Sequence, residues 1–516
     1  MIPYNRNTLP RHVNVEGARI RSASIKVFCL KLLNPSTLQR SETGHTLVIP
    51  RYDRPVTLNT TLGMLAGLVL LCTGGCGTPS TEENISAPEV EGKDPTILVH
   101  APHPTALPKS AVGGYLAGRH ARNVYDSEAA SVFFNRALES DPNNPELLRR
   151  TLTAMVGEGR IVESLPLANR LVGLKILDPI AFLSLATDQV RANEFQAARY
   201  QLTSLPKTGF YPYLKSLLIA WTVAGDGEGD SALEKLKFLS ESSNFSATHD
   251  YHAGLIADLF GMNDAAHATY RSAVSSVRGP RLRSVLAAGS FYERNGRAEE
   301  ARRLYEAFPN AGPETTALDT ALKRLQDGHV ALPFVNDARQ GYAEALFEIA
   351  ASFFKDRAYE PALIYVQMAL HVRPDLDVGR ILLADIYVAT EHYVDAVGAF
   401  REVSPESPFR WSARIRLANA LNQAGELDQA SKELRALATE RTERADPLMA
   451  LADLFRSEER YKDAVSVYDE AIERIAKIQQ HHWTLFYARG MSLERIGQWP
   501  RAELDLLRAL ELQPDQ

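Results

Sequence analysis

The residues best suited to chemistry are few and lie far apart in the chain. Residues 225–230 alternate glycine with acidic residues, but Ser231 stands where a calcium loop needs another glycine, so we expect a solvated turn. His481 and His482 are adjacent rather than one helical turn apart, which disfavours a shared metal ion. Neither a nucleotide-binding glycine pattern after an apolar strand, nor a Gly-x-Ser-x-Gly elbow, nor a His-Glu-x-x-His motif occurs. We therefore expect a protein that is not an enzyme, with no catalytic residue, no metal and no cofactor.

The elements that would position any binding residue come from an internal repeat. Four segments begin at Ala343, Asp377, Trp411 and Ala445, at a spacing of 34 residues. In each segment, apolar or small residues recur at positions 7, 8 and 11, with leucine or arginine at position 4. A turn falls at 15, alanine stands at 20, and apolar residues follow at 24 and 27. Both groups have the spacing of one helical face, so each segment predicts two helices.

One such helix pair cannot bury its apolar faces alone. Small residues at positions 8 and 20 allow the two helices to approach closely, and the larger residues must be covered by the next pair. With its small residue at 8, its alanine at 20 and Pro374 and Pro408 at 32, the pattern resembles that of the tetratricopeptide repeat family. The resemblance implies an all-α fold, a right-handed α-solenoid of stacked antiparallel helix pairs.

The same pattern extends toward both ends of the chain. We expect an N-terminal array over 110–315, with weak units near 180 and 211, and a C-terminal array over 343–516 that is truncated at its end. Residues 316–342 break the series, with one helix over 316–326 and a loop after it. This break is either a hinge between two halves of the solenoid or a loop that projects into its groove.

The first 109 residues do not follow the repeat. Residues 1–57 carry nine Lys or Arg and no sustained period, and are expected to be disordered or to precede the true start codon. Residues 58–76 resemble the signal of a bacterial lipoprotein, because a ten-residue apolar stretch at 62–71 precedes two glycines and Cys76. That resemblance implies export and lipidation of Cys76, hence an outer-membrane or periplasmic protein; a cytoplasmic location is the alternative. Residues 77–109 read as a proline-rich linker.

The resemblance also implies where partners would bind. In tetratricopeptide arrays the first helices line a concave groove, through positions 2, 5, 9 and 12 of each repeat. Carried onto this sequence, these positions nominate a peptide groove formed by Phe347, Ile381, Asp385, Ile415, Asn419, Asn422, Asp453, Arg456 and Tyr487. The Lys and Asn clamp with which some members hold a C-terminal carboxylate is not matched.

Composition agrees with a binding protein rather than with a nucleic-acid or membrane-surface partner. The net charge of the 516 residues is only −6, and all three cysteines precede the repeats, so no disulfide framework is available to the repeat region. We expect a non-catalytic scaffold that binds protein segments at the bacterial cell envelope, with an undefined oligomeric state. The alternatives are a regulatory or assembly module of an enzyme complex, and a cytosolic scaffold.

Overall fold

The computed structural model describes residues 110–275, 279–309 and 312–514. The expectations for 1–57, 58–76 and 77–109, including lipidation of Cys76, lie outside these residues. Chain contacts define one compact unit over Asp94–Gln516, which contains every described residue. The described residues form α-helices and two short 3₁₀ turns but no strand, and consecutive helices pack in pairs, which confirms the all-α solenoid.

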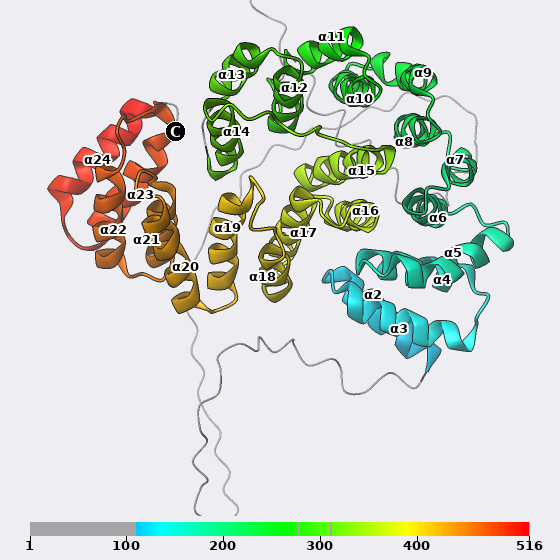
Figure 1. The fold of residues 1–516 in the computed structure, drawn as a ribbon. Helices are drawn as coiled ribbons and strands as arrows, with labels where there is room; N and C mark the ends of the chain where they lie inside the picture. The colour runs from blue at the N-terminus through cyan, green and yellow to red at the C-terminus, as the bar shows by residue number, and fades with distance from the viewer. Residues whose placement is uncertain (1–109, 276–278, 310–311, 515–516) are drawn as a thin grey trace, which may run out of the picture. The chain divides into compact units, whose positions relative to one another are not determined.

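Helices α2 to α14 form the first series of pairs (Figure 1). The expected helices at the weak units near 180 and 211 are present as α6 and α8, and the helix expected over 316–326 is α14. The bounds are α2 Ala111–Asn123, α3 Ser127–Ser140, α4 Pro145–Gly157, α5 Ile161–Gly173, α6 Pro179–Arg191, α7 Phe195–Thr203, α8 Tyr211–Gly225, α9 Gly229–Ser240, α10 Ser246–Leu259, α11 Asn263–Val274, α12 Leu282–Arg294, α13 Ala298–Ala307, η2 Pro313–Thr315 and α14 Thr316–Gln326.

Helices α15 to α24 form the second series, in which each 34-residue unit is one helix pair. The bounds are α15 Ala338–Lys355, α16 Tyr359–Val372, α17 Asp377–Ala389, α18 Tyr393–Arg401, α19 Arg410–Gln423, α20 Leu427–Glu440, α21 Asp446–Ser457, α22 Tyr461–Glu473, η3 Gln480–His482, α23 Trp483–Arg495 and α24 Trp499–Leu512.

Local sequence signals set where several helices begin. The Asn144 side chain accepts hydrogen bonds from the first backbone N–H groups of α4, and Pro145 follows at the first helical position. Asp178 and Pro179 do the same for α6, with a bond of 2.9 Å to the Ala181 amide. Asp337 begins α15 through a bond of 2.8 Å to the Gln340 amide.

Packing inside each unit follows the small residues of the repeat. The alanines at positions 8 and 20 are fully buried, which confirms that they lie between the paired helices; they are Ala350, Ala384, Ala418, Ala452, Ala362, Ala396, Ala430 and Ala464. Glycine fills the same role where the opposite residue is large. A Cβ on Gly254 would lie 2.7 Å from the Tyr270 ring, so this helix pair needs glycine there.

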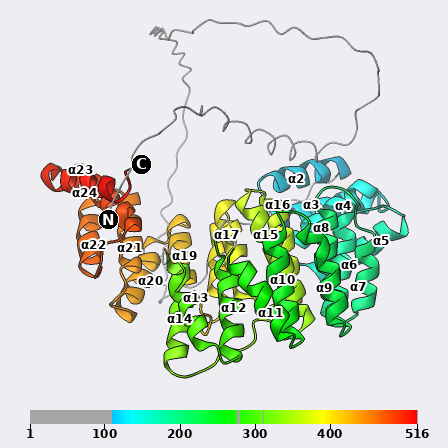
Figure 2. The ribbon, with the colours of Figure 1, turned by 90° about the horizontal axis from the view of Figure 1, so that it is seen from above.

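The second series does not simply continue the first. Helix α15 contacts α8 and α10, and α16 contacts α4 and α6, although these helices are more than 75 residues apart in sequence (Figures 1 and 2). These four partners are the first helices of their pairs, which line the inner face of a solenoid. The hairpin of α15 and α16 therefore occupies the inner face of the first series. The helices on this face are α15 and α16 and not the break at 316–342, for which a hinge and a loop that projects into the groove stay the two predictions.

Buried polar contacts fix α15 in this position. Glu348 accepts hydrogen bonds from Thr248 (2.6 Å) and from His252 (3.1 Å), and it pairs with Arg281. The Trp221 ring N–H donates to His252 (3.0 Å), so the imidazole bridges α8 and α15. Burial disfavours the charged form of Glu348, but the bond from His252 and the charge of Arg281 outweigh it and lower the pKa of Glu348 to about 2.

One turn earlier on α15, a second carboxylate is fully buried. Glu344 accepts a bond from the Tyr251 hydroxyl (2.8 Å) and a two-pronged contact from the Arg283 guanidinium. Burial alone would raise the pKa of Glu344, yet the charge and hydrogen bonds of Arg283 lower it. A shift of α15 would leave the buried Glu344 carboxylate without its arginine, which is unfavourable. Helix α15 therefore has one preferred register on α10 and α12.

The hydrophobic cores divide at α17 rather than at the expected break. One cluster of buried residues runs from Ala137 to Ile386 and a second from Ile381 to Leu485. The first unit of the expected C-terminal array, formed by α15 and α16, packs into the first core as well as against α17, and the domain bounds stay a prediction. The break itself also packs: Val335 is buried, and the Ala331 amide donates to Glu293 (2.9 Å).

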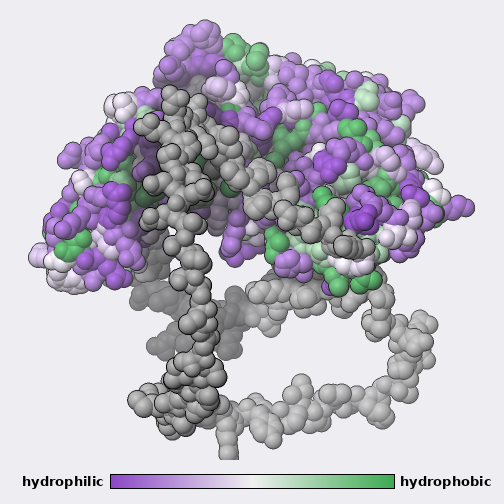
Figure 3. Space-filling model, turned by 90° about the horizontal axis from the view of Figure 1, so that it is seen from below, coloured by the Kyte–Doolittle hydropathy of each residue, from purple (hydrophilic) through white to green (hydrophobic). Residues whose placement is uncertain are grey.

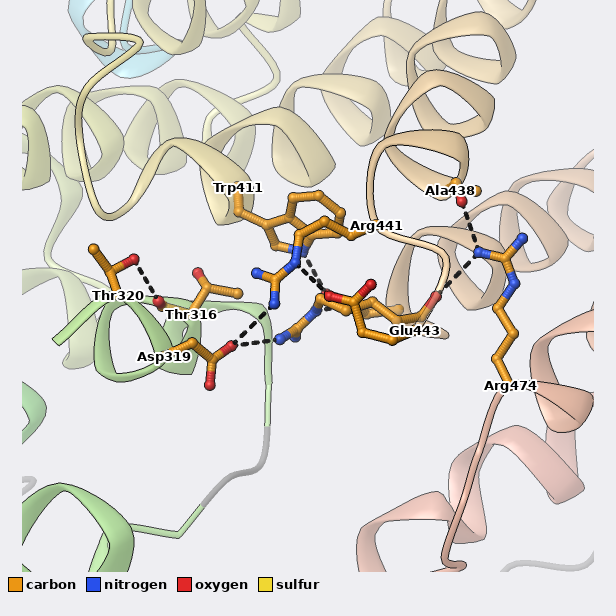
Figure 4. A network of polar contacts seen from close by, with 10 residues as sticks. Thr316, Asp319, Thr320, Trp411, Ala438, Arg441, Glu443 and Arg474 are labelled. Carbon is orange, nitrogen blue, oxygen red and sulfur yellow. Dashed lines mark hydrogen bonds and ion pairs between the residues drawn. The ribbon is translucent and has the colours of Figure 1, made fainter. Parts of the chain in front are cut away.

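A polar network joins the end of the first series to the second. Asp319 on α14 lies 2.9 Å from Arg444, which also holds Asp446, and Asp446 accepts from the Trp411 ring N–H at 2.7 Å (Figure 4). Arg441 lies over the same indole ring, 5.3 Å from its centroid. These contacts connect α14 with α19 and with the turn between α20 and α21.

The face drawn in Figure 3 is mostly hydrophilic, with small separate hydrophobic patches. Within the described ranges, no helix combines the length and the apolar character needed to cross a membrane.

Candidate peptide-binding groove

Three successive first helices, α19, α21 and α23, bring together five of the nine nominated groove residues. Asn419 and Asn422 lie on α19, Asp453 and Arg456 on α21, and Tyr487 on α23. Because each helix presents positions 5, 9 and 12 on the same side, these residues lie along one face of the second series.

A cavity of about 300 Å³ opens between α21 and α23. Three nominated residues lie at its wall, together with two methionines that stand at groove positions 5 and 9. The lining consists of Met449, Asp453, Arg456, Tyr468, Trp483, Thr484, Leu485, Tyr487, Ala488 and Met491. Aromatic, methionine and arginine side chains are the types enriched at the centres of protein interfaces.

Hydrogen bonds and an ion pair hold the charged side chains of this cavity in place. Asp453 accepts a hydrogen bond of 2.6 Å from the Tyr468 hydroxyl and pairs with Arg456 at 3.3 Å. Burial beside this carboxylate raises the pKa of Tyr468 well above its usual value, so the phenol stays protonated and keeps donating. The Asp453 and Arg456 side chains are about half exposed, at 51% and 42%, and can still meet a ligand.

The two asparagines differ in their surroundings. Asn419 is exposed, whereas Asn422 is half-buried and its amide nitrogen lies 3.5 Å from the Ser457 hydroxyl. The Asn422 amide oxygen is buried and has no hydrogen-bond partner within the described structure. Buried polar atoms normally find a partner, and this oxygen would meet a ligand N–H group only after the Asn422 side chain turned toward the surface.

The other nominated residues have different environments. Ile381 and Ile415 are only 8% and 6% exposed and belong to the second core, so the expectation that they face an open groove is corrected. Neighbouring helices cover position 5 in these inner units, whereas Tyr487 in the last unit is 49% exposed. Phe347 lies under the Arg283 guanidinium, 5.3 Å from its ring centroid, on the hairpin packed into the first series.

Asp385 is also engaged within the chain. It pairs with Arg416, which in turn pairs with Glu314 ahead of α14. Burial raises the pKa of Asp385, and the charge of Arg416 opposes this effect. The Asp385 side chain therefore belongs to the contact between the two series and not to the cavity.

Trp483 and Tyr468 line the cavity, although the groove positions of the repeat do not nominate them. Trp483 stands at position 1 of its unit, and Tyr468 lies on a second helix, whose side chains the groove rule does not consider. The signal that could have found Trp483 is its size, because a tryptophan in the first turn of a helix is unusual at a purely solvated position, and here it is half-buried.

The residues examined for metal binding do not gather. In the described ranges, no group of three or more His, Cys, Asp or Glu side chains could hold a metal ion. Asp226 pairs with Arg199, and the ring of His481 lies 4.0 Å from that of His482 between centroids, with the two planes tilted by 49°. The chemistry that this face offers is hydrogen bonding, ion pairing and apolar contact.

Stacked helix pairs with small residues at fixed positions define a helical-repeat protein. Residues 381–449 and 449–516 match the sequence model of the tetratricopeptide repeat family, which covers most of the second series. The C-terminal part of the chain, residues 381–516, therefore carries tetratricopeptide repeats. No curated protein matches it.

Three solved structures are similar to parts of this chain at low sequence identity. A tetratricopeptide repeat protein from Parabacteroides merdae is 16% identical over 59% of this chain and 94% of its own, with a TM-score of 0.30. YrrB, described as a TPR protein with an unusual peptide-binding site, is 18% identical over 34% of this chain and 88% of its own, with a TM-score of 0.24. MamA from Desulfovibrio magneticus RS-1 is 16% identical over 34% and 96%, with a TM-score of 0.28.

Proposed function

We propose that this protein is a non-catalytic scaffold that binds an extended segment of a partner protein across α19, α21 and α23. The observation that carries the proposal is the cavity of about 300 Å³ between α21 and α23, lined by Met449, Met491, Tyr487 and Trp483 with an ion pair at its edge. Concave, largely apolar sites with a few placed polar groups are typical binding sites.

In this proposal, different residues of the groove contact the side chains and the backbone of the bound segment. An apolar or aromatic side chain of the bound segment enters between the two methionines, whose flexible side chains adapt to its shape. Asn419, and Asn422 once its side chain has turned toward the surface, bond the segment's backbone, and Asp453 and Arg456 bond its polar groups.

The first series contributes to binding in a different way. Its inner helices α4, α6, α8 and α10 are already in contact with α15 and α16. A partner segment would have to displace that hairpin and expose Glu344 and Glu348, so the open groove of the second series is the favoured site.

Site-specific photocrosslinking tests the location of the groove. A photoreactive phenylalanine at Tyr487 should crosslink a partner, whereas the same group at Tyr200, which is 72% exposed on α7, should not. The double substitution Asn419→Ala with Asn422→Ala should weaken capture of that partner without changing helicity. Equal crosslinking at both tyrosines, or unchanged capture by the double variant, would refute this placement.

We also propose that the scaffold is exported and tethered to a bacterial membrane through lipidated Cys76. The support is the sequence of 62–76, with its short apolar stretch followed by Gly74, Gly75 and cysteine. Metabolic labelling with a fatty acid, compared between the natural chain and a Cys76→Ala variant, checks this proposal. An unlabelled protein in the cytosolic fraction would remove it.

A further inference from the structure

Large hydrophobic side chains that are exposed to solvent gather at the first and the last helix pair that the structure describes. On α2, α3 and the turn between them they are Val112, Leu116, Val124, Tyr125 and Val132. On α24, the red helix in Figure 1, they are Trp499, Leu504, Leu507 and Leu510. Exposed apolar side chains that gather on one face commonly mark a protein interface.

The exposed leucines of α24 depart from the repeat. At position 25 the four preceding units hold the polar residues Gln367, Arg401, Arg435 and Asp469. The last unit instead has Leu507, which is 52% exposed. The packing of α24 inside its own pair does not require this leucine, because the buried side of the helix carries Ala502 and Ala509.

The junction between α22 and the last pair shows what position 25 contacts. Asp469 at position 25 of α22 pairs with Arg489, at position 7 of α23, over 2.7 Å. Four positions earlier, Val465 is buried in a cluster with Leu493 of the same first helix. This side of a second helix therefore receives the first helix of the following pair, and on α24 the same side carries Leu507.

Helix α2 is a first helix with a matching exposed side. In the unit that begins at Ala111, position 7 is Ala117, with Gly113 one turn before it and Leu116 beside it. Leu116 is 56% exposed, and Gly113 and Ala117 are half-buried. Small residues on one helix leave room for the large side chains of another, so leucines of a second helix can pack there.

The charges of the two exposed sides also complement each other. Helix α2 contains no acidic residue, and Arg119 and His120 are exposed near Leu116. On α24, Glu503 and Glu511 are exposed on the side that carries Leu507, although Glu511 also pairs with Arg508 within the helix. Two α24 faces would bring glutamates together, whereas α24 on α2 brings acidic against basic residues.

We propose that two copies of this chain associate head to tail, with the exposed side of α24 in one copy packed on the exposed side of α2 in the other. The contact repeats the way in which α22 meets α23 inside the chain, with Leu507 and Ala117 in place of the ion pair of Asp469 with Arg489. It joins two different faces, so each copy keeps one free face for a further copy. The contact does not depend on the groove proposed above.

Sedimentation velocity of the full chain in a concentration series tests the proposal. The average mass should rise with concentration. Leu507→Glu with Leu510→Glu, and separately Leu116→Glu, should each raise the Kd of association at least about tenfold, the factor that ~1.4 kcal/mol produces, because a glutamate would be buried without a partner. Val162→Glu is the matched control, since Val162 is 52% exposed on α5, and it should associate as the natural chain does.

Mixing the two variants distinguishes a head-to-tail contact from any other. Each variant keeps the face that the other has lost, so the mixture should form a dimer and no larger species, although each variant alone is monomeric. Circular dichroism checks that the variants are folded, and Leu507→Ser replaces the double substitution if helicity falls.

Three results would overturn the proposal. The first is a natural chain that stays monomeric throughout the series. The second is association that persists in both variants, as it would through the apolar stretch at 62–71, which both retain. The third is association that only the α24 variant loses, as it would if two α24 faces met. None of these results bears on the groove between α21 and α23, which is tested by crosslinking at Tyr487.

Discussion

At the residue scale, the turn at position 15 of each unit needs a left-handed backbone. Gly425 and Gly497 meet this need with φ of 84° and 75°. Arg357, Glu391 and Glu459 occupy the same position with φ of 58°, 66° and 57°, although a side chain makes this region unfavourable by roughly 1–2 kcal/mol. The repeat therefore tolerates local backbone strain in three of its five units.

Glu459→Gly should stabilise the protein, because glycine adopts the left-handed turn without the steric cost of a Cβ. The gain should be ~0.5–1 kcal/mol, since part of the relieved strain is offset by the greater freedom of glycine in the unfolded chain. The urea midpoint of the transition that includes α21 and α22 measures it. Glu459→Ala keeps the Cβ and should give no gain; a Gly variant less stable than the Ala variant would contradict this account.

The groove residues at positions 9 and 12 of the repeat could be predicted from the sequence. Asn419, Asn422, Asp453 and Arg456 could be nominated because helical spacing alone decides which side of a helix they occupy. The prediction for position 5 was wrong at Ile381. Burial there depends on how closely the neighbouring helix pair packs, which the spacing of residues in the sequence does not determine.

At the element scale, α16 differs from the other helices of the repeat because it is apolar on all sides. Residues 362–369 are all buried, including Tyr365 and Gln367, so this helix is covered on every side. A helix that is apolar all round is a core helix and not a surface helix of a solenoid. The helix itself was predictable from the sequence, but its docking on α4 and α6 was not, since those partners are set by contacts between residues far apart in the chain.

The docking of α15 depends on a close approach at Gly341. A Cβ there would lie 2.1 Å from the ring of Trp221, which is fully buried on α8. Gly341→Ala should therefore lower the stability by ~1–3 kcal/mol, through displacement of the indole and its bond to His252. The thermal midpoint and the near-ultraviolet circular dichroism measure this change.

Gly398→Ala on α18 is the matched control for that substitution. Gly398 also lies inside a helix, and a Cβ there would meet nothing within 4 Å. Its replacement should raise stability by ~0.5–1 kcal/mol, as expected for Gly to Ala in a helix interior. If both variants behave alike, close packing on Trp221 does not determine where α15 docks.

At the scale of the whole molecule, the two cores predict unequal resistance to opening. The hairpin of α15 and α16 touches four helices of the first series as well as α17, whereas the main contacts of α23 and α24 are with each other and with α21, α22 and η3. Hydrogen exchange should be slowest in α15 and α16 and fastest in α23 and α24, because a repeat with one neighbour can open by itself. Equal protection across both regions would contradict this prediction.

The hairpin also changes what the first series is. Its inner face is already occupied by α15 and α16, which belong to the same chain and are connected to α14 by residues 327–337. Cutting that connection would leave two polypeptides whose mutual recognition rests on Glu344, Glu348 and the pocket around Trp221. The first series and the hairpin therefore resemble the two partners of a complex, which their covalent connection keeps from dissociating.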